Sequence, residues 1–212
     1  MKKTLLAALL LVAGHANATV IGGVDFPDGA ISFVDNVVSF TPGPDVAGPY
    51  LDASNVLGTP DYTGPDGYNS DGAIALGDGG VLIAEFVDNS LTTSGDAAAD
   101  LWIFEIGGVV EAFNVAISTD LVHWIELGSL SGQPTGIDID PIAGVVAGTQ
   151  YRYVRLSDNP ALNQTNSPFG EADIDAIGAI SSAPPAPVPA PGALLLLLAG
   201  IVSVRLGARA RG

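Results

Sequence analysis

Three acidic residues are spaced two apart in the stretch EADIDAI, at Glu171, Asp173 and Asp175. Side chains two residues apart in a β-strand point to the same side, so a strand here would align three carboxylates on one face. Like charges in a row repel unless the face is solvated or a cation neutralises it. Oxygen-only ligands suit Ca²⁺, which takes about six to eight oxygens in flexible geometry. The spacing leaves both interpretations open: a calcium site, or a plain solvated face.

Two further acids are candidates for the same chemistry. Asp158 ends the neighbouring stretch RYVRLSDN, and Glu105 lies among apolar residues in DLWIFEIGG. Because an unpaired buried charge is costly, we expect Glu105 to bond to Arg152, to Arg155 or to a metal. The predicted calcium ligands are therefore Glu105, Asp158, Asp173 and Asp175.

Tyrosines in the Gly-, Pro- and Asp-rich region 41–72 are candidates for ligand binding. An exposed ring of Tyr50, Tyr62 or Tyr68 could stack on the apolar face of a sugar, and Tyr62 and Tyr68 are the candidates we select. The alternative is that such a ring pins a long loop to the body of the domain.

The residues needed for most enzyme chemistry are missing. The chain has no cysteine, and His123 is the only histidine after the first 15 residues. No Gly-x-Ser-x-Gly motif accompanies it, so a Ser-His-Asp triad is not expected. A glycoside hydrolase that uses two carboxylates is the one enzymatic alternative, because two acids about 5–10 Å apart suffice for it. We expect a protein that is not an enzyme.

The elements that would position these residues are β-strands. Short apolar runs rich in Val, Ile, Phe and Tyr alternate with Gly, Pro, Asp and Asn, which predicts an all-β antiparallel sandwich of the jelly-roll type. In AFNVAIS, alternation places Phe113, Val115 and Ile117 in the core. The predicted strands are residues 31–40, 81–87, 101–106, 112–118, 123–127, 150–157 and 173–180.

The N-terminus has the features of a secretory signal peptide. Two lysines precede an apolar run over residues 5–13, and Ala16 and Ala18 form a small-x-small pair. This pattern predicts a signal peptide over residues 1–18 that signal peptidase cleaves after Ala18.

Charge is divided sharply along the chain. All 23 acidic residues lie between Asp25 and Asp175, whereas Arg152 and Arg155 are the only cations between residues 19 and 183, which leaves that segment a net charge of −21. Nucleic acid binding requires a basic surface, so the charge excludes it.

The C-terminal segment combines a spacer, an apolar run and arginines. Residues 181–191 are rich in proline and predict an extended spacer after a domain over residues 19–180. Residues 192–212 contain an apolar run of about 12 residues, which is short for a helix spanning a core of roughly 30 Å. Because Lys and Arg beside apolar stretches stay in the cytoplasm, both ends face inward and the acidic middle is exported.

This tail resembles the PEP-CTERM sorting signal of Gram-negative bacteria, with alanine where the usual motif has glutamate. The matching residues are Val188, Pro189, Ala190 and Pro191, followed by Arg205, Arg209 and Arg211. The resemblance implies recognition and cleavage by an exosortase-type membrane protease, with the membrane as a transient anchor.

The order of the later strands resembles the discoidin-like and galactose-binding jelly rolls. The similarity lies in VAISTDLVHWIELG, with Ser118, Asp120 and Trp124, and in YRYVRLSD. The closing EADIDAIGAI is similar to the last strand of carbohydrate-binding modules of that shape, in which an Asp often holds a structural calcium. Relatives of this shape bind sugars or surface ligands through loops at one rim.

These observations predict an exported cell-surface or matrix protein that binds a polysaccharide or surface glycan and carries calcium. Two alternatives stay open: a structural matrix component without a small ligand, and the carboxylate-dependent hydrolase.

Overall fold

The computed structural model describes residues 19–44, 46–62, 72–159, 161 and 171–184. In these ranges the regular structure consists of β-strands and three 3-10 helices of four residues each, so the all-β prediction is confirmed. No helix in the described part of the chain is long and apolar enough to cross a membrane. Several predicted residues lie outside the described ranges: Ala16, Ala18, Tyr68, Pro189, Ala190, Pro191, Arg205, Arg209 and Arg211.

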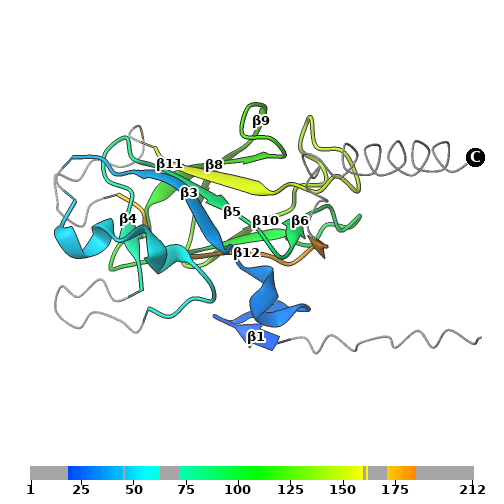
Figure 1. Cartoon of the computed structure of the whole chain (residues 1–212), viewed down its shortest axis with the longest axis horizontal. Coiled ribbons are helices and arrows are strands. Elements are labelled where there is room, and N and C mark those ends of the chain that lie inside the picture. Colours follow the sequence, from blue (N-terminus) through cyan, green and yellow to red (C-terminus); the bar gives the residue numbers. More distant parts are fainter. Residues whose placement is uncertain (1–18, 45, 63–71, 160, 162–170, 185–212) are drawn as a thin grey trace, which may run out of the picture.

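Two antiparallel sheets form the body of the molecule, and they pack as two layers (Figure 1). The five-stranded sheet has the order β3 (Asn36–Thr41), β5 (Val81–Glu85), β11 (Tyr153–Asp158), β8 (Ala112–Ser118) and β9 (Trp124–Ser131). The four-stranded sheet has the order β10 (Thr135–Ile137), β7 (Leu101–Ile106), β12 (Asp173–Ala179) and β4 (Ile74–Ala75). The chain crosses between the layers repeatedly from β5 to β12, as sandwich strands with Greek-key connections do.

Short elements complete the described structure. The strands β1 (Thr19–Ile21) and β2 (Val24–Phe26) form a hairpin, and β6 (Ser90–Leu91) pairs with β13 (Ser182–Ala183). The 3-10 helices are η1 (Gly29–Ser32), η2 (Gly48–Leu51) and η3 (Ala53–Val56).

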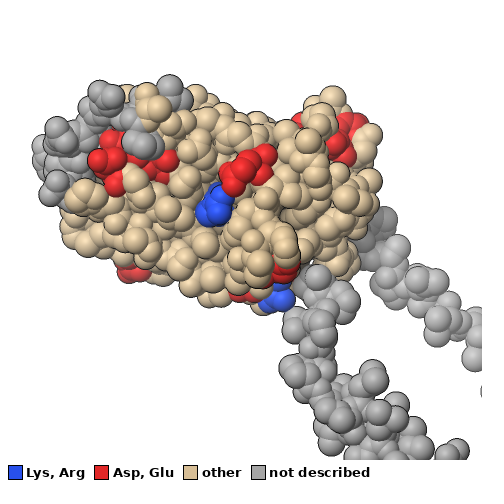
Figure 2. All heavy atoms as spheres, turned by 90° about the horizontal axis from the view of Figure 1, so that it is seen from above, with Lys and Arg blue, Asp and Glu red and all other residues tan. Residues whose placement is uncertain are grey.

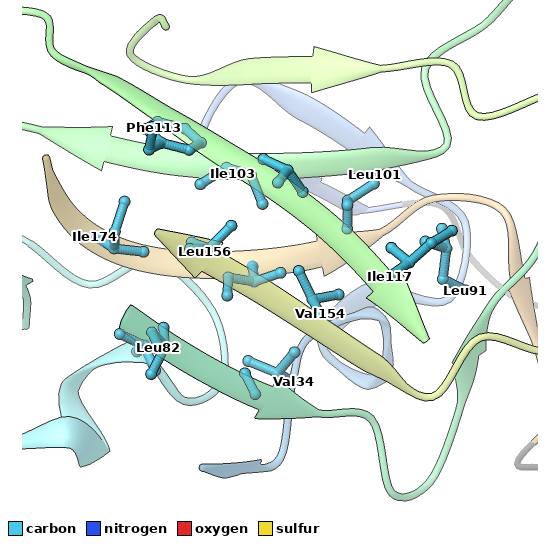
Figure 3. Close-up of a cluster of buried hydrophobic side chains, with 14 of the residues drawn as sticks. Val34, Leu82, Leu91, Leu101, Ile103, Phe113, Ile117, Val154, Leu156 and Ile174 are labelled. Carbon is cyan, nitrogen blue, oxygen red and sulfur yellow. The ribbon is translucent and has the colours of Figure 1, made fainter. Parts of the chain in front are cut away.

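The main core lies between the two sheets and follows from alternation along the strands (Figure 3). On β8, Phe113, Val115 and Ile117 are buried in it, as the sequence predicts. Leu101 and Ile103 from β7 meet them from the facing sheet. Burying one such side chain contributes about 1.5–3 kcal/mol, so this interface is the main source of stability.

A second apolar cluster covers the outer side of the four-stranded sheet. Phe26 from β2, Phe33 after η1 and Phe104 from β7 pack with ring centroids 4.6 to 6.2 Å apart. The N-terminal segment thereby shields the outer face of β7 and β12, whereas the main core covers their inner face. This double burial explains why β12 is buried along its whole length.

The predicted strand boundaries are wrong in several places. Residues 31–40 do not form one strand, because Ile31 lies in η1 and β3 begins at Asn36. The strand predicted over residues 123–127 extends to Ser131. The fold also continues past residue 180 into the predicted spacer, since β13 pairs with β6 there. The strands β1, β2, β4, β6 and β10 were not expected.

Gly178 on β12 offers a test of the second cluster. A Cβ there would lie 2.8 Å from a ring carbon of Phe26 and 3.0 Å from one of Phe33. Gly178→Ala should therefore lower the free energy of unfolding by about 1–3 kcal/mol in a thermal or urea melt. Gly108→Ala is the matched control, because nothing lies within 4 Å of its Cβ; equal losses for the two variants would contradict this packing.

Candidate metal centre

Five acidic residues gather at the edge of the sandwich where β7 and β11 end and β8 and β12 begin. We call this set the acidic cluster: Glu105, Glu111, Asp158, Glu171 and Asp173. Asp158 is paired with Phe113 near the start of β8, and Asp173 with Ile106 at the end of β7. Figure 2 shows acidic side chains in separate groups, at each end of the body, beside an arginine in the middle of this face and along its lower edge. Antiparallel pairing therefore brings together residues far apart in sequence.

Glu105 is the member of the acidic cluster that is most deeply buried. Its residue is only 2% exposed, and neither carboxylate oxygen has a hydrogen-bond partner. The nearby Gln133 amide donates instead to the carbonyl oxygens of Gly107 and Val109, at 3.3 and 3.2 Å. Burial raises the pKa of Glu105 to about 8; the nearby Gln133 amide and Glu111 backbone amide oppose this rise without forming a hydrogen bond of regular geometry, and the charge of Glu111 adds to it.

The prediction that Glu105 pairs with Arg152 or Arg155 is wrong. Arg152 forms an ion pair with Glu85, at 2.6 Å between Nε and Oε1, and Arg155 pairs with Glu126. No other Lys or Arg occurs between residues 19 and 184. In the described structure, Glu105 is therefore a buried acid to which no arginine or lysine is paired.

Burial and neighbouring negative charges also disfavour the ionised forms of Asp173 and Glu111. Asp173 is 6% exposed, and its Oδ1 has no hydrogen-bond partner. Burial raises the pKa of Asp173 to about 8, and the charges of Glu111 and Glu105 raise it further. Burial also raises the pKa of Glu111 to about 7, with contributions from the charges of Glu171 and Asp158. The members of the acidic cluster thus oppose one another's ionisation.

Asp158 and Asp175, the other two predicted ligands, are placed differently from each other. Asp158 ends β11 within the acidic cluster, and its Oδ2 accepts from the Gly79 amide at 3.0 Å. Asp175 instead accepts from the backbone amides of Asp61 and Tyr62, at 3.1 and 3.4 Å. Burial raises the pKa of Asp175 to about 6 against the effect of these two hydrogen bonds.

A β-bulge explains why the acids of EADIDAI do not share one regular strand face. The register between β12 and β7 shifts between Ile174 and Ala176, so Asp175 has no partner on β7. Glu171 lies before β12 and has a φ of 72°. A bulge inserts an extra residue and breaks the two-residue period, so the alternation assumed from the sequence fails here.

Tyr62 lies at the same end of the molecule as the acidic cluster. Its backbone is fixed by Asp175, and its ring is half-buried. The neighbouring Tyr50 is buried, and the pKa of its hydroxyl is raised by burial and then by the charges of Asp173 and Tyr62. The ring of Tyr50 therefore packs against the body, as the loop-pinning alternative describes for this region.

A second group of acids, which the sequence analysis missed, lies in the loops around β10. Asp100, Asp138 and Asp140 are the one set of three among the described residues whose ligand atoms all lie within 4.8 Å of one another. Asp100 accepts from the amides of Ser94 and Ile139, both at 2.9 Å. The D-x-D spacing at residues 138–140 could have drawn attention to this group. Its hydrogen bonds already give it a structural role in holding the loops.

The negative charge of the acidic cluster can be compensated in two ways, by protons or by a cation. The cluster can hold protons at neutral pH, because burial raises the pKa of Glu105 and Asp173 to about 8. Its side chains also offer the oxygen ligands that a hard divalent cation prefers, although no three of these carboxylates have ligand atoms that all lie within 4.8 Å of one another.

No family model matches the sequence, and no curated protein shows significant similarity to it. Among solved structures, the C-terminal domain of a chitobiase from Bacteroides fragilis is similar to this chain, at 14% sequence identity. The match covers 71% of this chain and 94% of that domain, with a TM-score of 0.37. A likeness at this level carries no argument about function.

The raised pKa values predict how stability depends on pH in a chelator-containing buffer. Between about pH 5 and 8 the folded protein holds protons on Glu105, Glu111 and Asp173 that the unfolded chain has released. The free energy of unfolding should therefore fall as pH rises through this window, by up to about 1.4 kcal/mol per pH unit for each proton. Urea melts across the window measure this slope, and a stability that rises with pH would contradict it.

Proposed function

We propose that the protein is an exported β-sandwich module that binds a glycan at the cell surface or in the matrix and carries a calcium ion in its acidic cluster. The observation that supports the ion is Glu105, a buried carboxylate without a hydrogen-bond partner in a cluster of five acids. Burying a charge in this way is unfavourable unless a counter-ion accompanies it.

Calcium matches the acidic cluster in donor type, because every side chain there offers oxygen, and its carboxylates would have to move closer together to bind one ion. Glu105, Asp173 and Glu111 supply carboxylates from the ends of two strands and one connection. A divalent cation would lower the pKa values of these acids and replace their mutual repulsion with attraction. Glu171 and Asp158 are further candidate ligands, because the charges of both act on Glu111. Asp175 would then support the site indirectly by holding the loop at Asp61.

Export is supported by the sequence pattern of the two ends. Apolar, basic termini flank a segment with a net charge of −21, a distribution typical of a chain whose middle crosses a membrane. The tail resembles a PEP-CTERM signal, so the proposal includes cleavage by an exosortase-type enzyme and a location at the cell surface or outside the cell.

A glycan partner is supported by the strand order and motifs that resemble discoidin-like and galactose-binding domains. The two-layered antiparallel body is compatible with such a jelly roll. Fold alone does not give function, so the partner has to be established by binding measurements.

Calcium should raise the thermal stability of the protein. At a calcium concentration 100 times the dissociation constant, a single site adds about 2.7 kcal/mol to the free energy of unfolding, and EGTA should reverse the shift. Glu105→Gln removes one ligand charge and should abolish most of the calcium-induced increase in Tm. Differential scanning calorimetry with and without calcium measures both effects.

The control for that experiment is Asp138→Asn in the second group of acids. It should leave the calcium-induced shift intact, because Asp138 lies outside the acidic cluster. A shift that survives Glu105→Gln but is lost in Asp138→Asn would move the ion to the loops around β10. No shift in wild-type protein would refute the calcium site.

The intact mass of the native product tests the proposed export. Mass spectrometry of the extracellular or surface fraction should find a chain that begins at Thr19 and has lost residues C-terminal to the spacer. A full-length chain of 212 residues in the cytosol would contradict the proposal.

A further inference from the structure

The first and the last described segments of the body meet at one pocket. Its volume is about 450 Å³, and it lies between the N-terminal segment, the connection after β5 and the residues around β13. We call it the exit pocket, and its lining residues are Pro27, Asp28, Ile31, Asp88, Asn89, Ser182, Ala183 and Pro184.

The last described residues are fixed to the body beside the exit pocket. The Ser90 hydroxyl lies 3.2 Å from the carbonyl oxygens of both Ala183 and Pro184, and the Gln150 amide donates to the carbonyl of Pro184 at 2.8 Å. The chain therefore leaves the body from a defined point. Residues 185–191 connect this point to the apolar and basic segment 192–212, and seven residues span at most about 25 Å even when fully extended.

The acidic cluster lies at the other end of the body. β4 pairs with β12 at Asp173 and Ile174, whereas β6 pairs with β13 beside the exit pocket. Figure 1 shows β4 and β6 at opposite ends. The length of β12 separates these ends by about 23 Å. A membrane that holds residues 192–212 would thus keep the exit pocket within reach and leave the acidic cluster free to face away.

The exit pocket combines apolar groups with two carboxylates. Ile31 is 54% exposed, and Val87 beside Asp88 is 44% exposed. In the described part of the chain, neither Asp28 nor Asp88 forms an ion pair. Zwitterionic lipid headgroups complement this surface, because they present ammonium groups above an apolar layer. An anionic lipid surface would instead be repelled by the carboxylates.

We propose that, before residues 192–212 are removed, the exit pocket rests on zwitterionic lipid headgroups, with Ile31 at the apolar contact and Asp28 and Asp88 beside the ammonium groups. The acidic cluster then faces away from the membrane. This inference rests on the proposed export, in which the tail anchors the chain transiently, and adds the orientation of the body. A weak contact suffices, because a short tether keeps the pocket at a high effective concentration near the lipid.

The chain has no cysteine, so a single introduced cysteine can carry a fluorescent probe to either end. Asp25→Cys labels an exposed position two residues before the exit pocket, and Asp78→Cys is the matched exposed position beside Gly79, which bonds to Asp158 at the acidic end. The full-length chain is reconstituted with vesicles of phosphatidylethanolamine and phosphatidylcholine that carry nitroxide headgroups. Because the ends lie about 23 Å apart, quenching should be about threefold or more stronger at residue 25 than at residue 78.

Ile31→Asp distinguishes a docked surface from one that is only tethered. The variant should lower the quenching at residue 25 to the level at residue 78, while the chain still floats with the vesicles through residues 192–212. Val122→Asp is the matched control, because Val122 is an exposed valine outside the exit pocket, and it should leave the quenching unchanged. Replacing half of the lipid with anionic phosphatidylglycerol should weaken the quenching at residue 25 without any change in the protein.

Three outcomes overturn the docking proposal while sparing the anchor: equal quenching at residues 25 and 78, no effect of Ile31→Asp, or stronger quenching at residue 25 with phosphatidylglycerol. A full-length chain that does not float with vesicles would contradict the membrane anchor itself, and the proposed role of the tail would fail with it.

Discussion

A buried carboxylate without a countercharge is the constraint on which this structure depends. Glu105 continues the inward-facing series of Leu101 and Ile103 on β7, so it enters the interior at the position where the apolar core ends. The only two arginines of the body are paired on the other sheet. The acidic end must therefore take up protons or an external cation, and its stability is linked to the solution around it.

The placement of acidic residues outside the apolar core explains how the fold accommodates so many of them. Its middle is held by aliphatic contacts between the layers and by the phenylalanine cluster outside β7 and β12, whereas the acids occupy strand ends and connections. Backbone amides satisfy some of them: Asp100 holds the loops around β10, and Asp175 holds the loop at Asp61. Glu105 and Asp173 keep oxygens without such donors, which separates a candidate ion site from structural acids.

The sequence predicted the parts of the fold that alternation controls and missed those that depend on backbone irregularity. The boundaries of β7 and β8 are correct because polar or turn-forming residues flank each strand, and Glu105 and Asp173 do lie together. Asp175 was misplaced because a bulge leaves no signal in a two-residue period. Glu111 was missed because it sits in a glycine- and valine-rich connection, where only the pairing of distant strands reveals its neighbours.

The division of charge along the chain also limits which polymers could approach the body. A cation at the acidic cluster would remove local repulsion but leave most of the −21 charge of the body in place. Long-range repulsion would still oppose a polyanion, so calcium binding alone does not create a site for acidic polymers. A neutral polymer avoids this electrostatic penalty. The scarcity of arginine thus leaves the acidic end without a countercharge of its own, because both arginines of the described body are paired with Glu85 and Glu126.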